Sequence, residues 1–177
     1  MEMMPDPVAG HDAPGMHLWG WMAPEELVWL AQQASRMRRV VEVGSLHGRS
    51  SFALAACPGE LYCIDPWPDG AWESWHRSVG SVLPNVRAIR GYSPDVGIDV
   101  PDPVDMVFLD GAHDYVSVVN DIEYWLPRTE VLLCGHDYRH ADYPDVAVVV
   151  DKILGPRAQL VPNTSIWAHW VHNLYGG

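Results

Sequence analysis

The sequence alternates between short apolar runs and longer stretches in which apolar residues recur every three or four positions. A short run such as MVFL predicts a buried strand, whereas the spacing of Leu27, Leu30 and Ala34 predicts an amphipathic helix. On this basis we predict strands at 39–44, 61–65, 86–91, 105–110 and 130–135, helices at 23–37, 50–56, 71–83, 115–126 and 145–154, and a hairpin at 158–171.

This alternation is typical of an α/β domain with a mainly parallel sheet that is covered by helices on both faces. In such a sheet the ligand binds beyond the carboxyl ends of the strands, near the point where the strand order reverses. We therefore expect one site to gather the residues that end or follow the predicted strands, which are Gly44, Asp65, Gly91, Asp110 and His136.

Length, charge and cysteine content limit the class of protein. A chain of 177 residues fits one domain, which we place at 21–177, after an irregular arm at 1–20 that is rich in proline and glycine. The net charge of −12 leaves no basic footprint, so we expect neither nucleic-acid nor membrane partners. Three cysteines without C-x-x-C spacing favour a reduced, cytoplasmic protein, and a homo-oligomer is an open alternative to a monomer.

The segment VVEVGSLHGRSS places Gly44 and Gly48 at a turn from a strand into a helix. Glycine lets a ligand approach backbone N–H groups, although a tight turn that needs glycine for its own dihedral angles is the alternative. Asp65 follows about twenty residues later, where an acid typically binds the ribose hydroxyls of a nucleoside. Because the segment lacks the G-x-G-x-x-G of a dinucleotide site, it predicts a different kind of nucleoside site.

Several other residues are candidates for contact with a ligand. Trp67 could lie against the base or fill a surface groove instead, and Ser93 is placed to hydrogen-bond the base. We expect the tryptophans elsewhere to lie mostly in the core, although those of the arm and of AWESWHR could wall a substrate pocket; they include Trp19, Trp21, Trp72 and Trp75.

Titratable side chains follow two of the predicted strands. Asp110 ends the strand at 105–110, and His136 and Asp137 follow the strand at 130–135. If these strands are neighbours, two carboxylates and an imidazole converge, a set that suits Mg²⁺, Mn²⁺ or a borderline transition metal. His113 would lie beside this site as a candidate general base. The alternative is that Asp137 and His113 only cap the turn and the helix that follow them.

Together these segments resemble class I S-adenosylmethionine-dependent methyltransferases, in particular the branch of macrolide sugar O-methyltransferases and cephalosporin-hydroxylase-like proteins. The likeness covers roughly Met22 to Tyr138 and is carried by VVEVGSLHGRSS, CIDPW, DMVFLDGAHDYVSVVNDIEYWLP and GHDY. It implies a Rossmann-like sandwich whose seven-stranded sheet has an antiparallel last strand. It also implies S-adenosyl-L-methionine as the cofactor, with Mg²⁺ or another divalent cation as a second candidate.

The resemblance also implies a role for individual residues. Asp110, His136 and Asp137 would bind the cation, and His113 would take the proton from the acceptor hydroxyl, with Asp110 as a second catalytic residue. His136 stands where these enzymes carry a glutamate, which leaves the identity of the metal open. The expected cofactor contacts are Glu42, Gly44, Ser45, Gly48, Ser50, Asp65, Trp67, Ser93 and Asp110.

The predicted function is therefore methyl transfer to a hydroxyl of a small, sugar-like or natural-product acceptor. One alternative is a nucleotide- or nicotinamide-dependent enzyme, which the missing G-x-G-x-x-G disfavours. The other is a binding protein that keeps the cofactor pocket without methyl transfer, which His136 and the short chain would allow.

Overall fold

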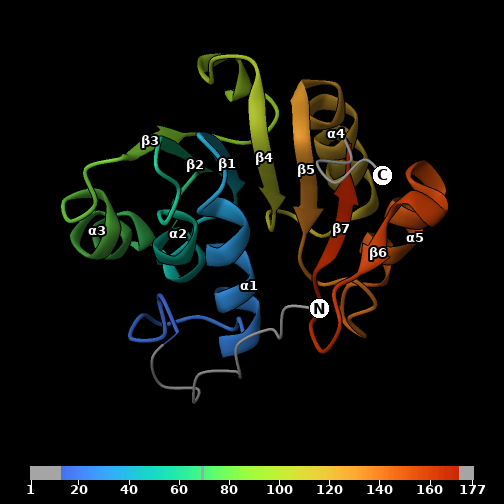
Figure 1. The fold of residues 1–177 in the computed structure, drawn as a ribbon, viewed down its shortest axis with the longest axis horizontal. Helices are drawn as coiled ribbons and strands as arrows, with labels where there is room; N and C mark the ends of the chain where they lie inside the picture. The colour runs from blue at the N-terminus through green and yellow to red at the C-terminus, as the bar shows by residue number, and fades with distance from the viewer. Residues whose placement is uncertain (1–12, 69, 172–177) are drawn as a thin grey trace, which may run out of the picture.

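The computed structural model describes residues 13–68 and 70–171, which contain one seven-stranded sheet in the order β3-β2-β1-β4-β5-β7-β6 (Figure 1). The pairings among β1 to β5 are parallel, and β7 runs antiparallel to both of its neighbours. This confirms the predicted sheet, including its antiparallel last strand. The strands are β1 (Arg39–Val43), β2 (Glu60–Asp65), β3 (Val86–Arg90), β4 (Val104–Leu109), β5 (Thr129–Gly135), β6 (Gln159–Leu160) and β7 (Trp167–Trp170).

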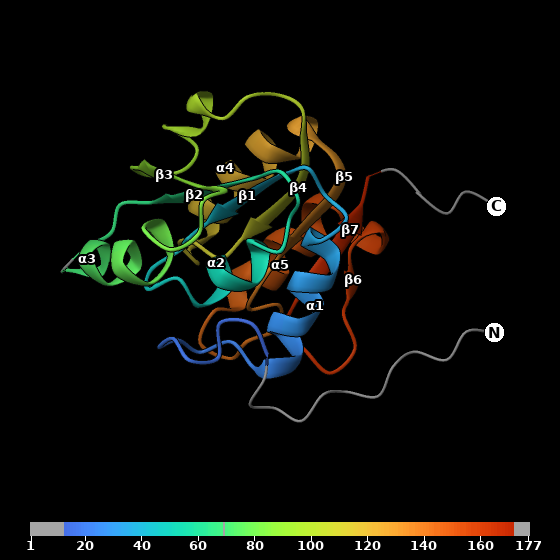
Figure 2. The same cartoon turned by 60° about the vertical axis from the view of Figure 1, so that its left-hand side comes forward.

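Helices cover both faces of the sheet, as predicted. Figure 2 shows α1 and α2 on one side of the strands and α4 on the other. The α-helices are α1 (Pro24–Ala34), α2 (Arg49–Leu54), α3 (Ala71–Trp75), α4 (Tyr115–Trp125) and α5 (Pro144–Ile153). A π-helical turn, η1 (His76–Gly80), continues α3, and short 3₁₀ turns lie at η2 (Gly97–Asp99), η3 (Leu126–Arg128) and η4 (Gly155–Arg157).

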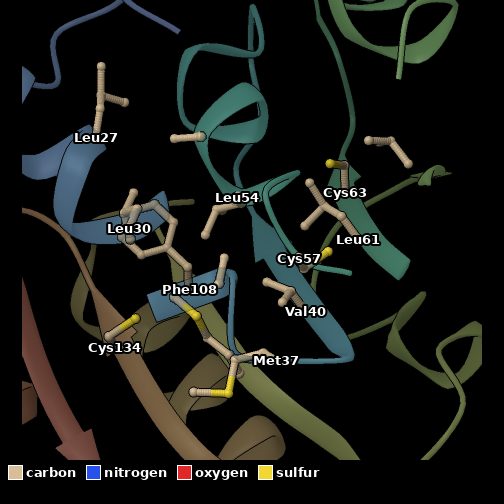
Figure 3. Close-up of a cluster of buried hydrophobic side chains, with 14 of the residues drawn as sticks. Leu27, Leu30, Met37, Val40, Leu54, Cys57, Leu61, Cys63, Phe108 and Cys134 are labelled. Atoms are coloured by element: carbon tan, nitrogen blue, oxygen red, sulfur yellow. The ribbon is translucent and has the colours of Figure 1, made fainter. Parts of the chain in front are cut away.

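The core consists of two apolar layers, one on each face of the sheet. Alternate residues of a strand point to opposite faces, so Val40 packs with α1 and α2 (Figure 3) while Val41 packs with α4 and α5. Because both faces are buried, the central strands are apolar at almost every position. The three cysteines, Cys57, Cys63 and Cys134, are free and buried in or beside this core.

The strand register brings the candidate site residues together. Val43 pairs with Leu109, and Leu109 pairs with Gly135, so β1, β4 and β5 end in one row. Beyond this row the amide of Asp110 donates to the carbonyl of Val43, at 2.8 Å, and the amide of His136 donates to that of Leu109, at 3.0 Å. The strand order reverses between β1 and β4, which is where an open α/β sheet binds its ligand.

The described part of the N-terminal arm has turns but neither helix nor strand before α1. Arg49, at the start of α2, fixes the arm because its Nη1 donates to the carbonyl oxygens of Gly20 and Leu18, at 2.7 and 3.3 Å. Residues 1–12 and 172–177 lie outside the described residues, so the domain limits remain a prediction. Within the described ranges, no helix combines the length and apolar character needed to span a bilayer.

Candidate active site

A cavity of about 920 Å³ lies at the carboxyl edge of the sheet. Its walls come from the segments that follow β1 to β5, from the arm and from α1. The volume falls in the range of small-molecule and cofactor sites. Nine of the predicted site residues line it: Gly44, Ser45, Ser50, Asp65, Ser93, Asp110, His113, His136 and Asp137.

The two glycines of the first motif are required by backbone geometry. Gly44 has φ +88°, and a Cβ there would lie 2.0 Å from the carbonyl oxygen of Asp110. Gly48 has φ +95°, and a Cβ there would lie 2.3 Å from Cγ2 of Val79. Glycine at 44 thus lets the ends of β1 and β4 meet at the cavity, whereas Gly48 serves the start of α2 and does not line the cavity.

The carboxylate of Asp65 ties together the loops that follow β1 and β2. Its Oδ2 accepts the backbone N–H groups of Ser45 and Leu46, both at 2.9 Å, and its Oδ1 accepts that of Trp67, at 2.5 Å. The side chain is nearly buried but lines the cavity. Oδ2 already accepts two N–H groups but Oδ1 accepts only one, so the second lone pair of Oδ1 can still accept a ligand hydroxyl.

Glu42 is placed differently from our expectation of a cofactor contact. It is fully buried and lies behind the cavity wall, where its carboxylate accepts hydrogen bonds from Ser45, Ser50 and Ser51 at 2.5 to 2.6 Å. Burial raises the pKa of Glu42, and the three hydroxyls oppose this shift. Its strand position points it toward α2, so it positions the serines of the loop and helix instead of touching the cavity.

Trp67 also lies away from the cavity. Its side chain is buried in the core, with ring centroids 4.8 Å from Trp75 and 5.1 Å from Trp72. The neighbouring Pro66 and Pro68 line the cavity in its place. This aromatic cluster removes the apolar surface of the indole from water.

Ser93 lines the cavity and is held by α4. Its hydroxyl donates to Oδ1 of Asp121, at 2.6 Å, and accepts from the indole N–H of Trp125, at 3.0 Å. Asp121 lines the cavity as well, and burial raises its pKa to about 6. The sequence patterns did not predict a role for Asp121. Its spacing from Val118 and Trp125 places this acid on the buried face of the helix, which would have indicated a special environment.

The residues of the predicted catalytic and metal centre converge. Nε2 of His113 lies 2.8 Å from Oδ2 of Asp137 and 3.7 Å from Oδ1 of Asp110. Nδ1 of His136 lies 3.4 Å from Oδ1 of Asp137 and 3.7 Å from Oδ1 of Asp110. Three side chains each place one potential ligand atom within 4.8 Å of the other two: Asp110, His113 and Asp137. At this spacing they could hold a single divalent cation.

The charges in this centre are strongly coupled. The adjacent carboxylates of Asp110 and Asp137 raise the pKa of His113 to about 9. Burial lowers the pKa of His136, but contacts with Asp137 and Glu26 outweigh it and raise that pKa to about 10. Burial raises the pKa of Asp110, whereas the two imidazoles hold that of Asp137 below its usual range against the effect of burial. Without a further cation, both histidines are therefore protonated at neutral pH.

Glu26 and Ser165 complete the wall beside His136. Nε2 of His136 lies 3.0 Å from Oε2 of Glu26 and 2.9 Å from the hydroxyl of Ser165. Burial raises the pKa of Glu26, but His136 and backbone N–H donors lower it to about 2 overall. The sequence marked Glu26 only as an acid in the first turn of a helix, and it does accept the N–H of Ala23 there, at 2.9 Å. No sequence pattern predicted that Ser165 would lie at this site.

Aromatic side chains form part of the cavity rim. Trp19 and Trp21 are 59% and 76% exposed, so they are not core residues. Both line the cavity, which agrees with the alternative that tryptophans of the arm wall a pocket. Trp75 is in the core as expected. The ring of Tyr143 stacks on that of His113, with centroids 4.1 Å apart and an interplanar angle of 18°.

The fold and the ligand-sized cavity at its switch point define the architecture of class I methyltransferases. Residues 41–138 match the model of a family described as a methyltransferase domain. This match spans more than half of the chain, which therefore belongs to that family. Family and fold confirm the resemblance that the motifs indicated.

Solved O-methyltransferases share the fold. TomG from Streptomyces achromogenes, involved in tomaymycin synthesis and solved with SAM, is 22% identical, covers 86% of this chain and 82% of its own, and has a TM-score of 0.66. CalS11, a TDP-rhamnose 3′-O-methyltransferase of calicheamicin biosynthesis, is 15% identical and covers 83% and 77%, with a TM-score of 0.65. At these identities the likeness establishes the fold alone.

A curated relative is the uncharacterized protein y4gI of Sinorhizobium fredii. It is 31% identical over 117 residues, which make up 57% of this chain. The chain spans only 13% of the length of that relative. The activity of y4gI as a whole therefore says nothing direct about this chain.

Proposed function

We propose that this chain transfers the methyl group of S-adenosylmethionine to a hydroxyl of a small molecule. The proposal rests on one observation, which is that two kinds of residue line the same cavity. Asp65 is suited to bind a nucleoside, and His113, with the carboxylates of Asp110 and Asp137 beside it, is suited to remove a proton. Membership of the methyltransferase-domain family supports the cofactor. TomG and CalS11, which share the fold, are O-methyltransferases by description.

The loops after β1, β2 and β3 fit the cofactor. A Cβ at Gly44 would collide with the backbone of Asp110, so glycine there lets the ends of β1 and β4 lie together at the cavity wall. Asp65 would accept the ribose hydroxyls, the segment from Gly44 to Ser45 would lie against the methionine part, and Ser93 would face the base. S-adenosylmethionine supplies a methyl group that is already activated, so the protein has to orient the reactants and remove a proton.

His113 is the proposed proton acceptor. Its side chain is 29% exposed and lines the cavity, and Tyr143 and Asp137 orient the ring. Only the neutral imidazole can accept a proton, and the raised pKa keeps the ring protonated at neutral pH. A divalent cation beside Asp110 and Asp137 would oppose the positive charge and lower this pKa.

Asp110, His136 and Asp137 would hold such a cation. Nδ1 of His136 lies 3.4 Å from Oδ1 of Asp137 and 3.7 Å from Oδ1 of Asp110. Two carboxylates with one imidazole nitrogen are a donor set that would fit a divalent ion. Bound there, the ion would lower the pKa of the acceptor hydroxyl. Asp110 and Asp137 also contact His113.

The proposed acceptor is a small hydroxylated molecule of sugar-like or natural-product type. Trp19, Trp21 and Tyr143 offer ring faces at the cavity rim, and such faces pack well against sugar and aromatic rings. The described TDP-rhamnose activity of CalS11 favours a sugar among these classes.

Two measurements test the proposal. In a thermal-shift comparison, S-adenosylmethionine should stabilise the protein and NAD should not, which separates a methyltransferase from a nicotinamide-dependent enzyme. With methyl-labelled cofactor and a panel of nucleotide sugars and small phenols, we expect label on a hydroxyl oxygen of at least one acceptor. Stabilisation by NAD alone would contradict the proposed function.

A further inference from the structure

We propose that the cation site selects a transition-metal ion over Mg²⁺, because Glu26 and Ser165 fix His136 as a nitrogen ligand between two carboxylates. This inference rests on the proposed function only in using the same cavity. It concerns the identity of the ion and the residues that set it.

His136 has the surroundings of a metal-binding histidine. Its side chain is 10% exposed, and its two ring nitrogens face opposite partners. Nε2 faces the carboxylate of Glu26 at 3.0 Å, while Nδ1 faces Oδ1 of Asp137 and of Asp110 at 3.4 and 3.7 Å. A carboxylate only accepts, so Nε2 carries the hydrogen and Nδ1 is the nitrogen that a cation would engage in place of a proton.

Glu26 is itself held rigidly. Its Oε1 accepts both the N–H and the hydroxyl of Ser165, at 2.8 Å each, and its Oε2 accepts the N–H of Ala23, at 2.9 Å. The side chain is 6% exposed. Glu26 belongs to α1 and Ser165 to the turn before β7, so both lie outside the residues 41–138 that match the family model. This support for His136 therefore comes from elements that the matched segment does not contain.

A second observation points to a cation at this place. Nε2 of His113 is buried, and among the described residues it has no hydrogen-bond partner of good geometry, although Oδ2 of Asp137 lies only 2.8 Å away. This nitrogen and the carboxylates of Asp110 and Asp137 form the group within 4.8 Å. The centre thus places one buried ring nitrogen, Nε2 of His113, beside carboxylate oxygens without a hydrogen bond of good geometry.

The donor set decides which ion fits. Mg²⁺ prefers oxygen ligands in strict octahedral geometry, whereas imidazole nitrogen suits zinc, iron, nickel and copper. Sites with nitrogen, oxygen or sulfur donors generally bind first-row metals more tightly from Mn²⁺ towards Cu²⁺, so tight Co²⁺ binding alone does not identify His136 as a ligand. The test of the proposal is therefore how far the preference for Co²⁺ over Mg²⁺ falls when His136 is replaced.

The test measures Co²⁺ and Mg²⁺ binding to the full chain by calorimetry, together with the visible absorption of bound Co²⁺. We expect Co²⁺ to bind at least about 100-fold more tightly than Mg²⁺, with bands that indicate nitrogen ligation. His136→Gln should lower the Co²⁺ affinity at least tenfold, leave Mg²⁺ affinity within about twofold, and shift the bands. Glu26→Gln should lower Co²⁺ affinity about 10- to 100-fold, whereas the exposed neighbour Glu25→Gln should not.

The outcomes separate this inference from the proposed function. Equal binding of the two ions, unchanged bands in His136→Gln, or equal effects of Glu26→Gln and Glu25→Gln would each overturn the inference. Ser165→Ala replaces Glu26→Gln if that variant fails to fold, with the same expected direction. Binding of S-adenosylmethionine is measured separately in the presence of EDTA, so a missing cofactor site contradicts the proposed function and leaves the metal result standing.

Discussion

Nε2 of His113 lies 2.8 Å from Oδ2 of Asp137, and this contact joins the segments that follow β4 and β5 inside the cavity. The two strands are neighbours in the sheet, so the contact follows directly from the strand order. It places an imidazole and a carboxylate where an acceptor hydroxyl would have to lose its proton.

Replacement of His113 tests its role as the proton acceptor. We expect His113→Gln to lower kcat about 100- to 10,000-fold, because general base catalysis contributes this much to proton transfer. Cofactor affinity should stay within about twofold, since the loops at Gly44 and Asp65 are unaffected. Label transfer and calorimetry measure the two quantities. His76→Gln, at an exposed position outside the cavity, is the matched control, and a His113→Gln enzyme as active as this control would remove His113 from the mechanism.

The pH dependence of methyl transfer tests the coupling between His113 and the cation. The carboxylates of Asp110 and Asp137 raise the pKa of His113 to about 9, and the reactive form is the neutral one. Without divalent ions, kcat/KM should therefore rise with pH up to about 9, and a bound divalent ion should move this rise to lower pH. Rates measured with EDTA and with Co²⁺ report both. A midpoint that does not move would contradict the coupling.

The substitution Gly44→Ala tests the close approach of Gly44 to the backbone of Asp110. A Cβ at Gly44 would lie 2.0 Å from the carbonyl oxygen of Asp110, and its φ of +88° disfavours other residues. We expect Gly44→Ala to lower the free energy of unfolding by about 2 to 4 kcal/mol and to weaken cofactor binding. The control is Gly155→Ala, whose φ is +55° with nothing within 4 Å, so only the backbone cost of about 1 kcal/mol should appear. Urea unfolding measures both, and equal losses would contradict the close approach.

Asp121 should make stability depend on pH. Its pKa in the folded protein is about 6, raised by burial and opposed by the Ser93 hydroxyl, with a smaller contribution from Asp114 that raises it further. Because this pKa is higher than in the unfolded chain, the folded state loses stability as the pH rises from about 4 to about 6, and the loss is constant at higher pH. Asp121→Asn should therefore stabilise the protein at pH 8 by up to about 3 kcal/mol and have little effect at pH 4. Thermal unfolding at the two pH values measures this, and a larger gain at pH 4 would contradict the shift.

The sequence predicted the fold because βαβ alternation and apolar runs are local signals. The same runs located Asp65, Asp110, His113, His136 and Asp137, since parallel strands end at one edge of the sheet. Glu26, Ser165 and Asp121 could not be placed this way, because their contacts depend on how α1, α4 and the turn before β7 pack against the sheet. Glu42 and Trp67 are adjacent to the site in sequence, but each points into the core instead.

A crystal structure of the chain with S-adenosylhomocysteine tests the central claim most directly. The account predicts that the ribose hydroxyls contact Asp65 and that the sulfur lies beside Gly44, facing His113 across the cavity. A nucleoside bound elsewhere, or a sulfur turned away from His113, would contradict it.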